Sequence, residues 1–271
     1  MSGWRNRFFI FLIMQQRQKN RELYFNELSI TSKKHFIPYI SKFKKIKAGM
    51  NILEVGCGDG GNLLPFAEIG CKITGVDMSG NRIKDAISFF KKNNTNGEFI
   101  ASDIFVLKEF EYNFDLIICH DVIEHIDNKR LFMRNLKKYV KPKGLIFMSF
   151  PAWQMPFGGH QQICKSKMVS HFPFIHLLPN TVYKLILQLA GESEDCIKEL
   201  LEIKKTRTSI ELFERLAKQE QIQISDRELY FINPHYEIKF GLKPRKLLHF
   251  IGILPYIRNF FTTSCFYILK V

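Results

Sequence analysis

Short apolar segments recur through the first part of the chain and alternate with stretches of helical periodicity. Segments of four to six residues that are rich in Ile, Val, Leu and Phe are typical of strands buried on both faces of a parallel sheet. We therefore predict strands at residues 50–55, 73–76, 97–101, 114–119 and 145–150. Helices are expected at residues 20–47, 82–92 and 129–140. This order predicts an α/β fold with helices on both faces of the sheet.

The pattern changes after Phe150. Residues 151–165 are rich in turn-forming and aromatic residues, and helical stretches follow before two further strands. We expect these helices at 180–190, 193–205 and 209–221, and the strands at 228–232 and 264–270. The chain is therefore divided into a basic helical segment (1–48), a sheet core (49–150), a helical lid or substrate insertion (151–227) and two closing strands with a basic link (228–271).

Two apolar segments lie outside the predicted sheet. Residues 8–14 form an aromatic run after Arg5 and Arg7, too short to span a bilayer and without the small-residue cleavage site of a signal peptide. We predict a helix that packs on the body of the protein, with an interfacial membrane anchor as the alternative. Residues 172–189 are also strongly apolar. They are expected to form a second small core, or to line a pocket for an apolar acceptor.

Charge is distributed unevenly along the chain. The net charge is +14, with +9 in residues 1–48, zero in 49–150 and +5 in 151–271. The basic link includes four Lys or Arg residues within 238–246. A basic surplus suits nucleic acid, an anionic membrane or an acidic substrate. With 46% hydrophobic residues, the composition excludes a disordered chain.

The cysteines indicate a cytoplasmic compartment. The chain contains six Cys without a CxxC pair or a zinc-type spacing, which favours reduced, mostly buried thiols. A metal site formed by His120, Glu124 and His125 lacks the spacing of a standard ligand set, so no metal is predicted. No feature of the sequence sets an oligomeric state.

A glycine-rich loop follows the first predicted strand. Gly56, Gly58 and Gly61 satisfy the pattern G-x-G-x-x-G, so a dinucleotide-binding fold is one reading. Glu54, two residues before the loop, would instead face a cationic ligand and repel a pyrophosphate.

Two further acids follow later strands. Asp77 ends the second strand and suits the hydroxyls of a ribose, and Asp103 follows the third and could accept a hydrogen bond from the amine of an adenine. A cationic amino-acid head, a ribose and an adenine together describe S-adenosylmethionine.

Five separated motifs occur in the order found in one enzyme family. They are residues 53–60, 75–79, 102–104, 114–117 running into 121–126, and 141–145. With them, residues 50–150 resemble the class I S-adenosylmethionine-dependent methyltransferases. The resemblance implies a Rossmann-like, doubly wound, seven-stranded, mostly parallel sheet with a reversed last strand, N-terminal helices and a helical insertion between strands 5 and 6.

The resemblance also implies a set of cofactor-binding residues. Glu54 and the loop backbone would hold the methionine moiety, Asp77 the ribose, and Asp103 with Ile104 the adenine. His120 would border the sulfonium. The full set is Glu54, Gly56, Cys57, Gly58, Gly60, Asp77, Met78, Asp103, Ile104 and His120. The bound cofactor would be S-adenosylmethionine and the product S-adenosylhomocysteine.

Methyl transfer to a hydroxyl group needs alignment and a base, and a histidine is well suited to be that base. His160 is the preferred candidate because it lies in a glycine-flanked aromatic loop after the fifth strand, and His125 and His235 are the alternatives. The alternative for each of these histidines is a structural role as a hydrogen-bonding residue. Asp121 and Glu124 have the spacing of a helix capping box.

These features predict a methyltransferase that acts on a small, apolar, aromatic or lipid-like acceptor, with oxygen as the favoured atom. The first alternative is an enzyme at a membrane surface that methylates a lipid-linked saccharide or a quinone-like ring, with peripheral membrane contact through the basic segments. An RNA methyltransferase is less favoured because no RNA-binding module is apparent. A non-catalytic binding protein would be expected to lose acids that this chain retains.

Overall fold

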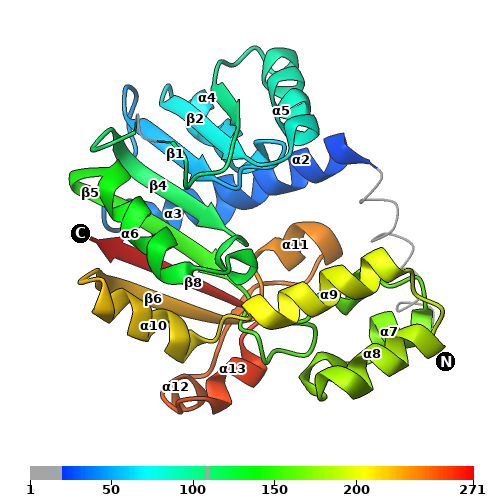
Figure 1. Cartoon of the computed structure of the whole chain (residues 1–271). Coiled ribbons are helices and arrows are strands. Elements are labelled where there is room, and N and C mark those ends of the chain that lie inside the picture. Colours follow the sequence, from blue (N-terminus) through cyan, green and yellow to red (C-terminus); the bar gives the residue numbers. More distant parts are fainter. Residues whose placement is uncertain (1–19, 108–109) are drawn as a thin grey trace.

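The computed structural model describes residues 20–107 and 110–271. The apolar run at 8–14 lies outside these residues, so the prediction for it is not addressed. Eight strands form a sheet in the order β3-β2-β1-β4-β5-β8-β6-β7 (Figure 1). They are β1 (Asn51–Val55), β2 (Lys72–Asp77), β3 (Glu98–Ala101), β4 (Phe114–His120), β5 (Val140–Phe150), β6 (Gln223–Ile232), β7 (Arg245–Lys246) and β8 (Ser264–Lys270).

Strands β1 to β5 pair in parallel, whereas β8 is antiparallel to both β5 and β6. The predicted doubly wound sheet with a reversed last strand is therefore confirmed. One strand was not expected, because the basic link contributes the two-residue β7, which pairs with the edge of β6. The same link contains three short helices: α11 (His235–Phe240), α12 (His249–Gly252) and α13 (Ile257–Phe261).

Helices cover both faces of the sheet, as the apolar strands require. Leu53 and Ile117 pack on one face with α6 (Lys129–Tyr139) and α10 (Ile210–Gln219). Ile52 and Ile118 belong to the opposite core. That core also takes side chains from α2 (Arg21–Thr31), α3 (Ile37–Ser41), α4 (Leu64–Glu68) and α5 (Gly80–Lys92). Alternate strand residues thus enter different cores, which explains why the strand segments are continuously apolar.

The helix expected at 20–47 is shorter and is interrupted. Residues 32–36 form a π-helical stretch between α2 and α3, and the second helix ends at Ser41. Pro38 is the second residue of α3, two positions after the wide turn ends at Phe36. Because proline lacks an amide hydrogen and crowds the carbonyl of the preceding turn, a locally widened helix accommodates it.

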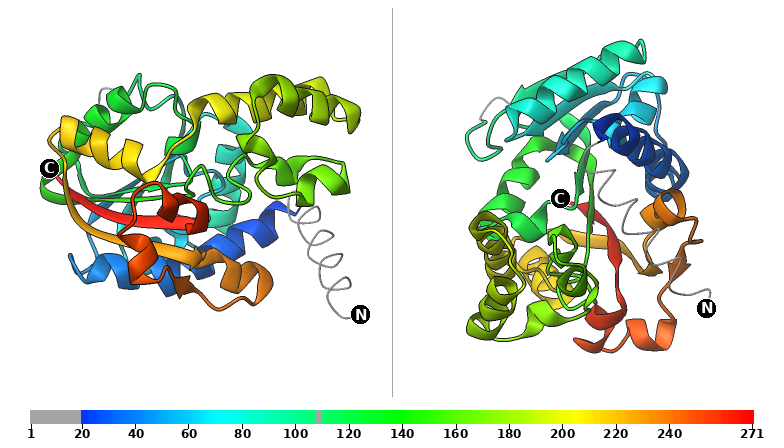
Figure 2. Two further views of the ribbon diagram at one scale, coloured as in Figure 1. Left: turned by 90° about the horizontal axis from the view of Figure 1, so that it is seen from below. Right: turned by 90° about the vertical axis from the view of Figure 1, so that its right-hand side faces the viewer.

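The helical insertion follows β5 and has a small core of its own. It contains α7 (Lys167–His171), α8 (Asn180–Leu189) and α9 (Glu194–Thr206), which lie to one side of the sheet (Figures 1 and 2). Val169, Tyr183, Leu187 and Leu200 are buried together there. The second small core is thus confirmed for these residues, although much of 172–189 is exposed. Every helix that the structure describes is too short or too polar to cross a bilayer.

Candidate active site

The glycine-rich loop leaves β1 in a backbone conformation that requires glycine. Gly56, Gly58 and Gly60 have φ angles of 69°, 52° and 81°, which residues with a Cβ rarely adopt. The amide of Gly56 donates to the carbonyl of Val76 over 2.8 Å, which anchors the loop to β2. A Cβ on Gly56 would lie 2.4 Å from Val122 Cγ2. The loop therefore forms a cradle that a side chain would fill.

Glu54 is almost fully buried beneath this loop. Its Oε1 accepts a hydrogen bond from Asn62 Nδ2 at 2.7 Å, while Oε2 has no hydrogen-bond partner among the described residues. Burial raises the pKa of Glu54 to about 8. A buried carboxyl with an unsatisfied oxygen is well suited to a cationic ligand, which would favour its ionised form.

Asp77 has a wider role than the sequence indicated. Its Oδ2 accepts from the amide of Gly58 at 2.9 Å, and its Oδ1 accepts from the amide of Ser79 at 2.8 Å. The carboxylate therefore braces the glycine loop. Each oxygen retains acceptor capacity for a ribose hydroxyl.

A cavity of about 620 Å³ opens at the carboxyl ends of β1, β2 and β4. We call it the cofactor cavity. Its lining includes five of the predicted cofactor residues, namely Gly56, Asp77, Met78, Asp103 and Ile104. It also includes residues that the motifs did not single out: Arg82, Phe105, Asp127, Asn128 and Leu131. Its volume is within the range of small-molecule sites. Together with the unsatisfied Glu54 and the glycine cradle, it fits S-adenosylmethionine.

The remaining predicted residues lie behind the lining. Gly58 and Gly60 contribute to the loop's shape, and Cys57 is buried with its Sγ 3.6 Å from the carbonyl oxygen of Gly58. The ring of His120 packs on Phe36, with the centroids 5.0 Å apart. His120 does not line the cavity, so its expected place beside the sulfonium stays a prediction.

A second cavity, of about 460 Å³, adjoins the first, and we call it the acceptor cavity. The two share Arg82, Asp121 and His125 in their walls. The three histidines predicted as candidate bases, His125, His160 and His235, all line the acceptor cavity. Aromatic and apolar side chains complete much of its wall, among them Tyr24, Met155, Phe157, Ile163 and Tyr236.

His125 and His160 are neighbours, with ring centroids 5.2 Å apart. Removal from water lowers the pKa of both imidazoles, and for His125 the adjacent His160 lowers it further. Both rings are therefore neutral near pH 7 and are able to accept a proton.

Close packing holds the His160 loop in place. A Cβ on Gly159 would lie 2.2 Å from the Cβ of His176, and one on Gly158 would lie 2.1 Å from the carbonyl oxygen of Trp153. His160 itself has a φ of 57°. The two glycines before His160 thus allow close contacts with His176 and Trp153 that hold the loop in one position.

His235 reaches the cavity from α11 and is oriented by α2. Thr31 Oγ1 donates its single hydrogen to the carbonyl of Glu27 at 2.8 Å and lies 2.9 Å from His235 Nδ1. If the hydroxyl donates to Glu27, it accepts from Nδ1 of His235, so this contact fixes the orientation of the imidazole ring. Residues 204 positions apart form this pair.

The prediction of a helix capping box at Asp121 and Glu124 is wrong. Asp121 has a φ of 54°, and the short 3-10 helix at 123–125 begins after Val122 without a side-chain cap. Glu124 is buried and neither carboxyl oxygen has a hydrogen-bond partner within the described part of the chain. Burial and the nearby Asp121 raise its pKa well above the usual value. A ligand atom of Glu124 lies within 4.8 Å of one from His125 and one from His160, whereas the sequence grouped His120 with them.

The N-terminal helix α2 contributes to both parts of the site. Arg21 pairs with Asp59 of the glycine loop, and Arg21 and Tyr24 line the acceptor cavity. Asp59 is buried, so this ion pair connects α2 to the cofactor loop. No local motif marks either residue, and the basic character of residues 1–48 was the only signal.

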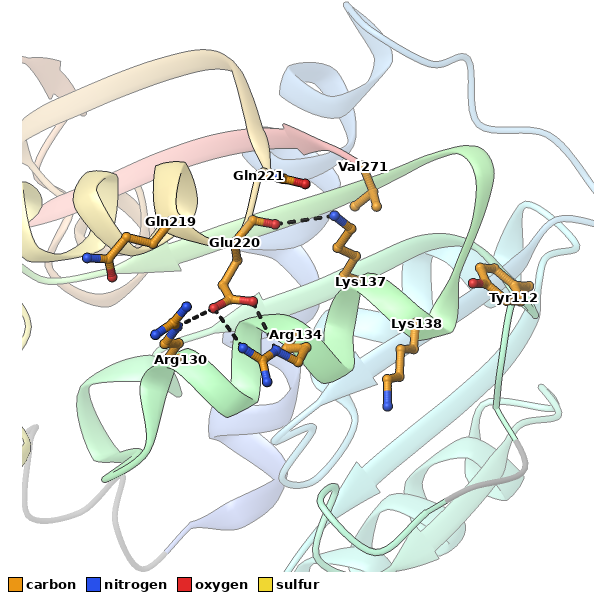
Figure 3. Close-up of a pocket in the computed structure, with 9 residues that line it drawn as sticks. All are labelled: Tyr112, Arg130, Arg134, Lys137, Lys138, Gln219, Glu220, Gln221 and Val271. Carbon is orange, nitrogen blue, oxygen red and sulfur yellow. Dashed lines mark hydrogen bonds and ion pairs between the residues drawn. The ribbon is translucent and has the colours of Figure 1, made fainter.

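A further cavity, of about 420 Å³, lies elsewhere, beside α6 and the end of α10 (Figure 3). Arg130, Arg134 and Lys137 point toward Glu220, and the first two lower the pKa of that carboxyl to about 2. This cluster ties the two helices together. It contains none of the predicted site residues.

Comparisons with known proteins agree with this geometry. A family described as "Methyltransferase domain" matches residues 46–220. The ubiquinone biosynthesis O-methyltransferase of Rickettsia akari is 35% identical over 115 residues, covering 42% of this chain and 43% of that protein. The enzyme of the same name from Coxiella burnetii is 32% identical over 113 residues, covering 42% and 48%. The chain thus spans less than half the length of these curated relatives.

Solved structures share the fold over a larger part of the chain. Phosphoethanolamine N-methyltransferase 2 of Haemonchus contortus, in complex with S-adenosyl-L-methionine, has a TM-score of 0.53 at 16% identity and covers 85% of this chain and 50% of that one. The YcgJ protein of Bacillus subtilis has a TM-score of 0.53 at 14% identity and covers 87% and 97%. The family match extends over more than half of the chain and includes the glycine loop and both acids that follow it. The chain therefore belongs to the class I S-adenosylmethionine-dependent methyltransferases, and S-adenosylmethionine is its cofactor.

Proposed function

We propose that the protein transfers the methyl group of S-adenosylmethionine to a hydroxyl oxygen of a small, apolar, aromatic or lipid-like acceptor. The observation that carries this proposal is the convergence of His125, His160 and His235 on a cavity that shares a wall with the cofactor cavity. A methyl donor in one cavity and a hydroxyl group in the other would meet at that shared wall.

The proposed role of the cofactor-binding residues is to bind S-adenosylmethionine and to orient it. Glu54 would face the ammonium group and become ionised on binding, because a nearby cation favours the charged carboxylate. Asp77 would accept from the ribose hydroxyls while it braces Gly58, and Asp103 with Ile104 would frame the adenine. When bound, the cofactor supplies an electrophilic methyl group on a sulfonium, so the protein's main task is alignment.

His160 is the proposed general base. It follows β5 at the cavity wall, its loop is fixed by the packing of Gly158 and Gly159, and it lies beside His125 at the shared wall. The neutral imidazole would accept the hydroxyl proton as the oxygen attacks the methyl carbon. His125 would position the acceptor, and His235, which Thr31 orients, would hold the acceptor from the opposite side of the cavity.

Two observations support an apolar ring as acceptor. Aromatic and apolar side chains form one part of the cavity wall, and charged groups from α2, α5, α9 and α11 form another. The curated relatives carry the name ubiquinone biosynthesis O-methyltransferase, which supports oxygen as the methylated atom.

The test is transfer of a labelled methyl group from S-adenosylmethionine to a panel of hydroxylated aromatic and prenylated ring compounds, with matched amines and thiols. Labelled ether products that disappear in Asp77→Ala are expected. Labelling of the amines alone would contradict oxygen transfer. If Asp77→Ala bound S-adenosylhomocysteine as tightly as the wild type in calorimetry, the assigned cofactor site would be wrong.

A further inference from the structure

Two segments outside both cavities expose large apolar side chains. The first is residues 172–189, which includes α8, and the second is residues 242–261, which includes α12 and α13. Monomeric proteins seldom expose many such side chains together without a partner. The exposed residues are Phe172, Phe174, Leu178, Val182, Leu185, Leu189, Leu242, Leu248, Phe250, Ile253, Leu254, Tyr256, Ile257, Phe260 and Phe261.

Helix α8 is apolar on two sides. Tyr183 and Leu187 are fully buried in the small core of the insertion. Val182, Leu185 and Leu189 recur at spacings of three and four residues and are 43%, 54% and 79% exposed. Residues at these spacings share a helix face. The helix thus has one face for its own core and a second apolar face that the described protein leaves in water.

The second segment exposes its apolar side in a fixed position. The Arg258 guanidinium donates to Glu211 at 3.0 Å and to Glu214 at 2.8 Å, and Asn259 Nδ2 donates to Glu211 at 2.6 Å. These contacts bury the polar side of α13 against α10. Because these buried polar contacts fix the rotation of α13 about its axis, Phe260 and Phe261 remain exposed.

The two segments meet. The rings of Phe174 and Phe260 have centroids 6.3 Å apart, and α8, α12 and α13 lie along the lower edge of the molecule in Figure 1. We call the exposed apolar residues of both segments the apolar rim. Figure 2 (left) shows this edge of the molecule from below.

The two segments of the apolar rim themselves carry basic side chains and no acidic ones. Residues 167–190 and 242–261 contain six Lys or Arg and neither Asp nor Glu. Lys184, Lys243, Arg245 and Lys246 are exposed beside the apolar side chains. Acids are supplied by neighbouring elements: Glu194 and Asp195 of α9 line a cavity together with Lys184, and Glu228 of β6 pairs with Lys246 at 2.9 Å. Lys243 and Arg245 are the exposed basic residues of the second segment for which no ion pair is found among the described residues. An apolar surface with basic neighbours complements an anionic phospholipid bilayer, where large apolar side chains enter the headgroup region and Lys and Arg contact phosphates.

We propose that the apolar rim is a membrane-binding surface and that its partner is an anionic phospholipid bilayer. The second segment lies in the chain between Lys239 and Thr263, both of which line the acceptor cavity. Docking through the rim would therefore place that cavity next to the lipid. This inference goes beyond the proposed function, because the surface would bind lipid whichever atom the enzyme methylates.

The test is flotation of the full-length protein with vesicles of phosphatidylcholine alone or mixed with phosphatidylglycerol. Strong flotation with the mixed vesicles and weaker flotation with the neutral ones are expected. Leu185→Ser with Leu189→Ser, and separately Phe250→Ser with Ile253→Ser, should each weaken vesicle binding by about tenfold. Lys243→Gln with Arg245→Gln should reduce binding to the anionic vesicles only. The matched control is Ile69→Ser with Ile87→Ser, two exposed residues near α4 and on α5, which should bind like the wild type.

Three results would overturn the proposal: a wild type that does not float with either vesicle, rim variants that float like the control, or a wild-type dimer that the rim substitutions dissociate in light scattering. The last result would assign the rim to a second copy of the chain. Calorimetry with S-adenosylhomocysteine and labelled-methyl transfer to a water-soluble acceptor, on the same variants, separate this proposal from the proposed function. Both should be unchanged in the rim variants.

Discussion

The cofactor and acceptor cavities share a wall but are assembled differently. The cofactor cavity takes its lining from residues between Val55 and Leu131, within one continuous stretch of strands and loops. The acceptor cavity takes its lining from residues between Arg21 and Thr263, on elements separated along almost the whole chain. The first depends on local loop geometry at the edge of a parallel sheet, whereas the second depends on how distant elements pack. Substitutions outside the shared residues Arg82, Asp121 and His125 should therefore affect the two cavities independently.

The largest effect is expected for Gly56→Val. Its Cβ would overlap Val122, and its positive φ is unfavourable for a branched residue. We expect S-adenosylhomocysteine to bind at least about a hundredfold more weakly in calorimetry. Gly241→Val is the control, since Gly241 also has a positive φ but has nothing within 4 Å of its Cβ position. Equal losses in both variants would mean that backbone strain alone explains the effect.

The next effect should be confined to the acceptor side. His160→Ala is expected to lower kcat by about 10²- to 10⁴-fold, as for loss of a general base, while calorimetry shows unchanged affinity for S-adenosylhomocysteine. His249→Ala, an exposed histidine on α12, is the control. The wild-type rate should fall on acidification only below about pH 6.5, because the pKa of His160 is lowered and protonation removes the base. A larger decrease of kcat in His235→Ala than in His160→Ala would instead identify His235 as the general base.

A third effect concerns Glu54 and pH. The pKa of Glu54 is raised to about 8 in the folded protein and is near 4.3 in an unfolded chain by the usual reference value. Between these values the folded protein holds a proton that the unfolded chain has released, so the free energy of unfolding falls as pH rises. Glu54→Gln should lose this dependence. Urea denaturation of the protein without cofactor, from about pH 5 to about pH 8, is the measurement. The free energy of unfolding of the variant, relative to that of the wild type, should rise by roughly 1 kcal/mol per pH unit. If the free energies of unfolding of the wild type and the variant changed in parallel with pH, Glu54 would already be ionised in the folded protein.

The smallest effect tests the contact between α2 and the glycine loop. Arg21→Gln removes the charge that faces the buried Asp59. The free energy of unfolding should fall by about 1–2 kcal/mol, which is less than for a fully buried ion pair because the arginine is partly exposed to water. The comparison is Lys33→Gln, in the π-helical stretch after α2, which breaks an exposed pair with Glu68 at 3.0 Å. This variant should change the free energy of unfolding by less than about 0.5 kcal/mol. Adding Asp59→Asn to the Arg21 variant should restore part of the loss. An equal effect of the two single variants would mean that Asp59 is well solvated.

Much of the cofactor half was predictable because its signals are local. Continuous apolar segments marked the strands, and the glycine spacing marked a turn next to Glu54 and Asp77. The structure places both acids at the loop, although Asp77 also braces Gly58. The capping box at Asp121 failed because a residue in the left-handed region cannot begin a helix in the usual way. The pairing of β7 with β6 was missed because two residues carry no periodic signal.

The sequence by itself determined the order of the strands and helices from β1 to β5, the position of the glycine loop and the acids at the sheet edge. It could do so because parallel strands bring their carboxyl ends to one edge whatever follows them. Only the tertiary structure decided that α2 reaches the acceptor cavity, that Thr31 orients His235, and that α8 and α13 leave apolar faces exposed. These depend on contacts between residues far apart in the chain. Such contacts follow from the packing of whole elements, and no local pattern of residue types encodes them.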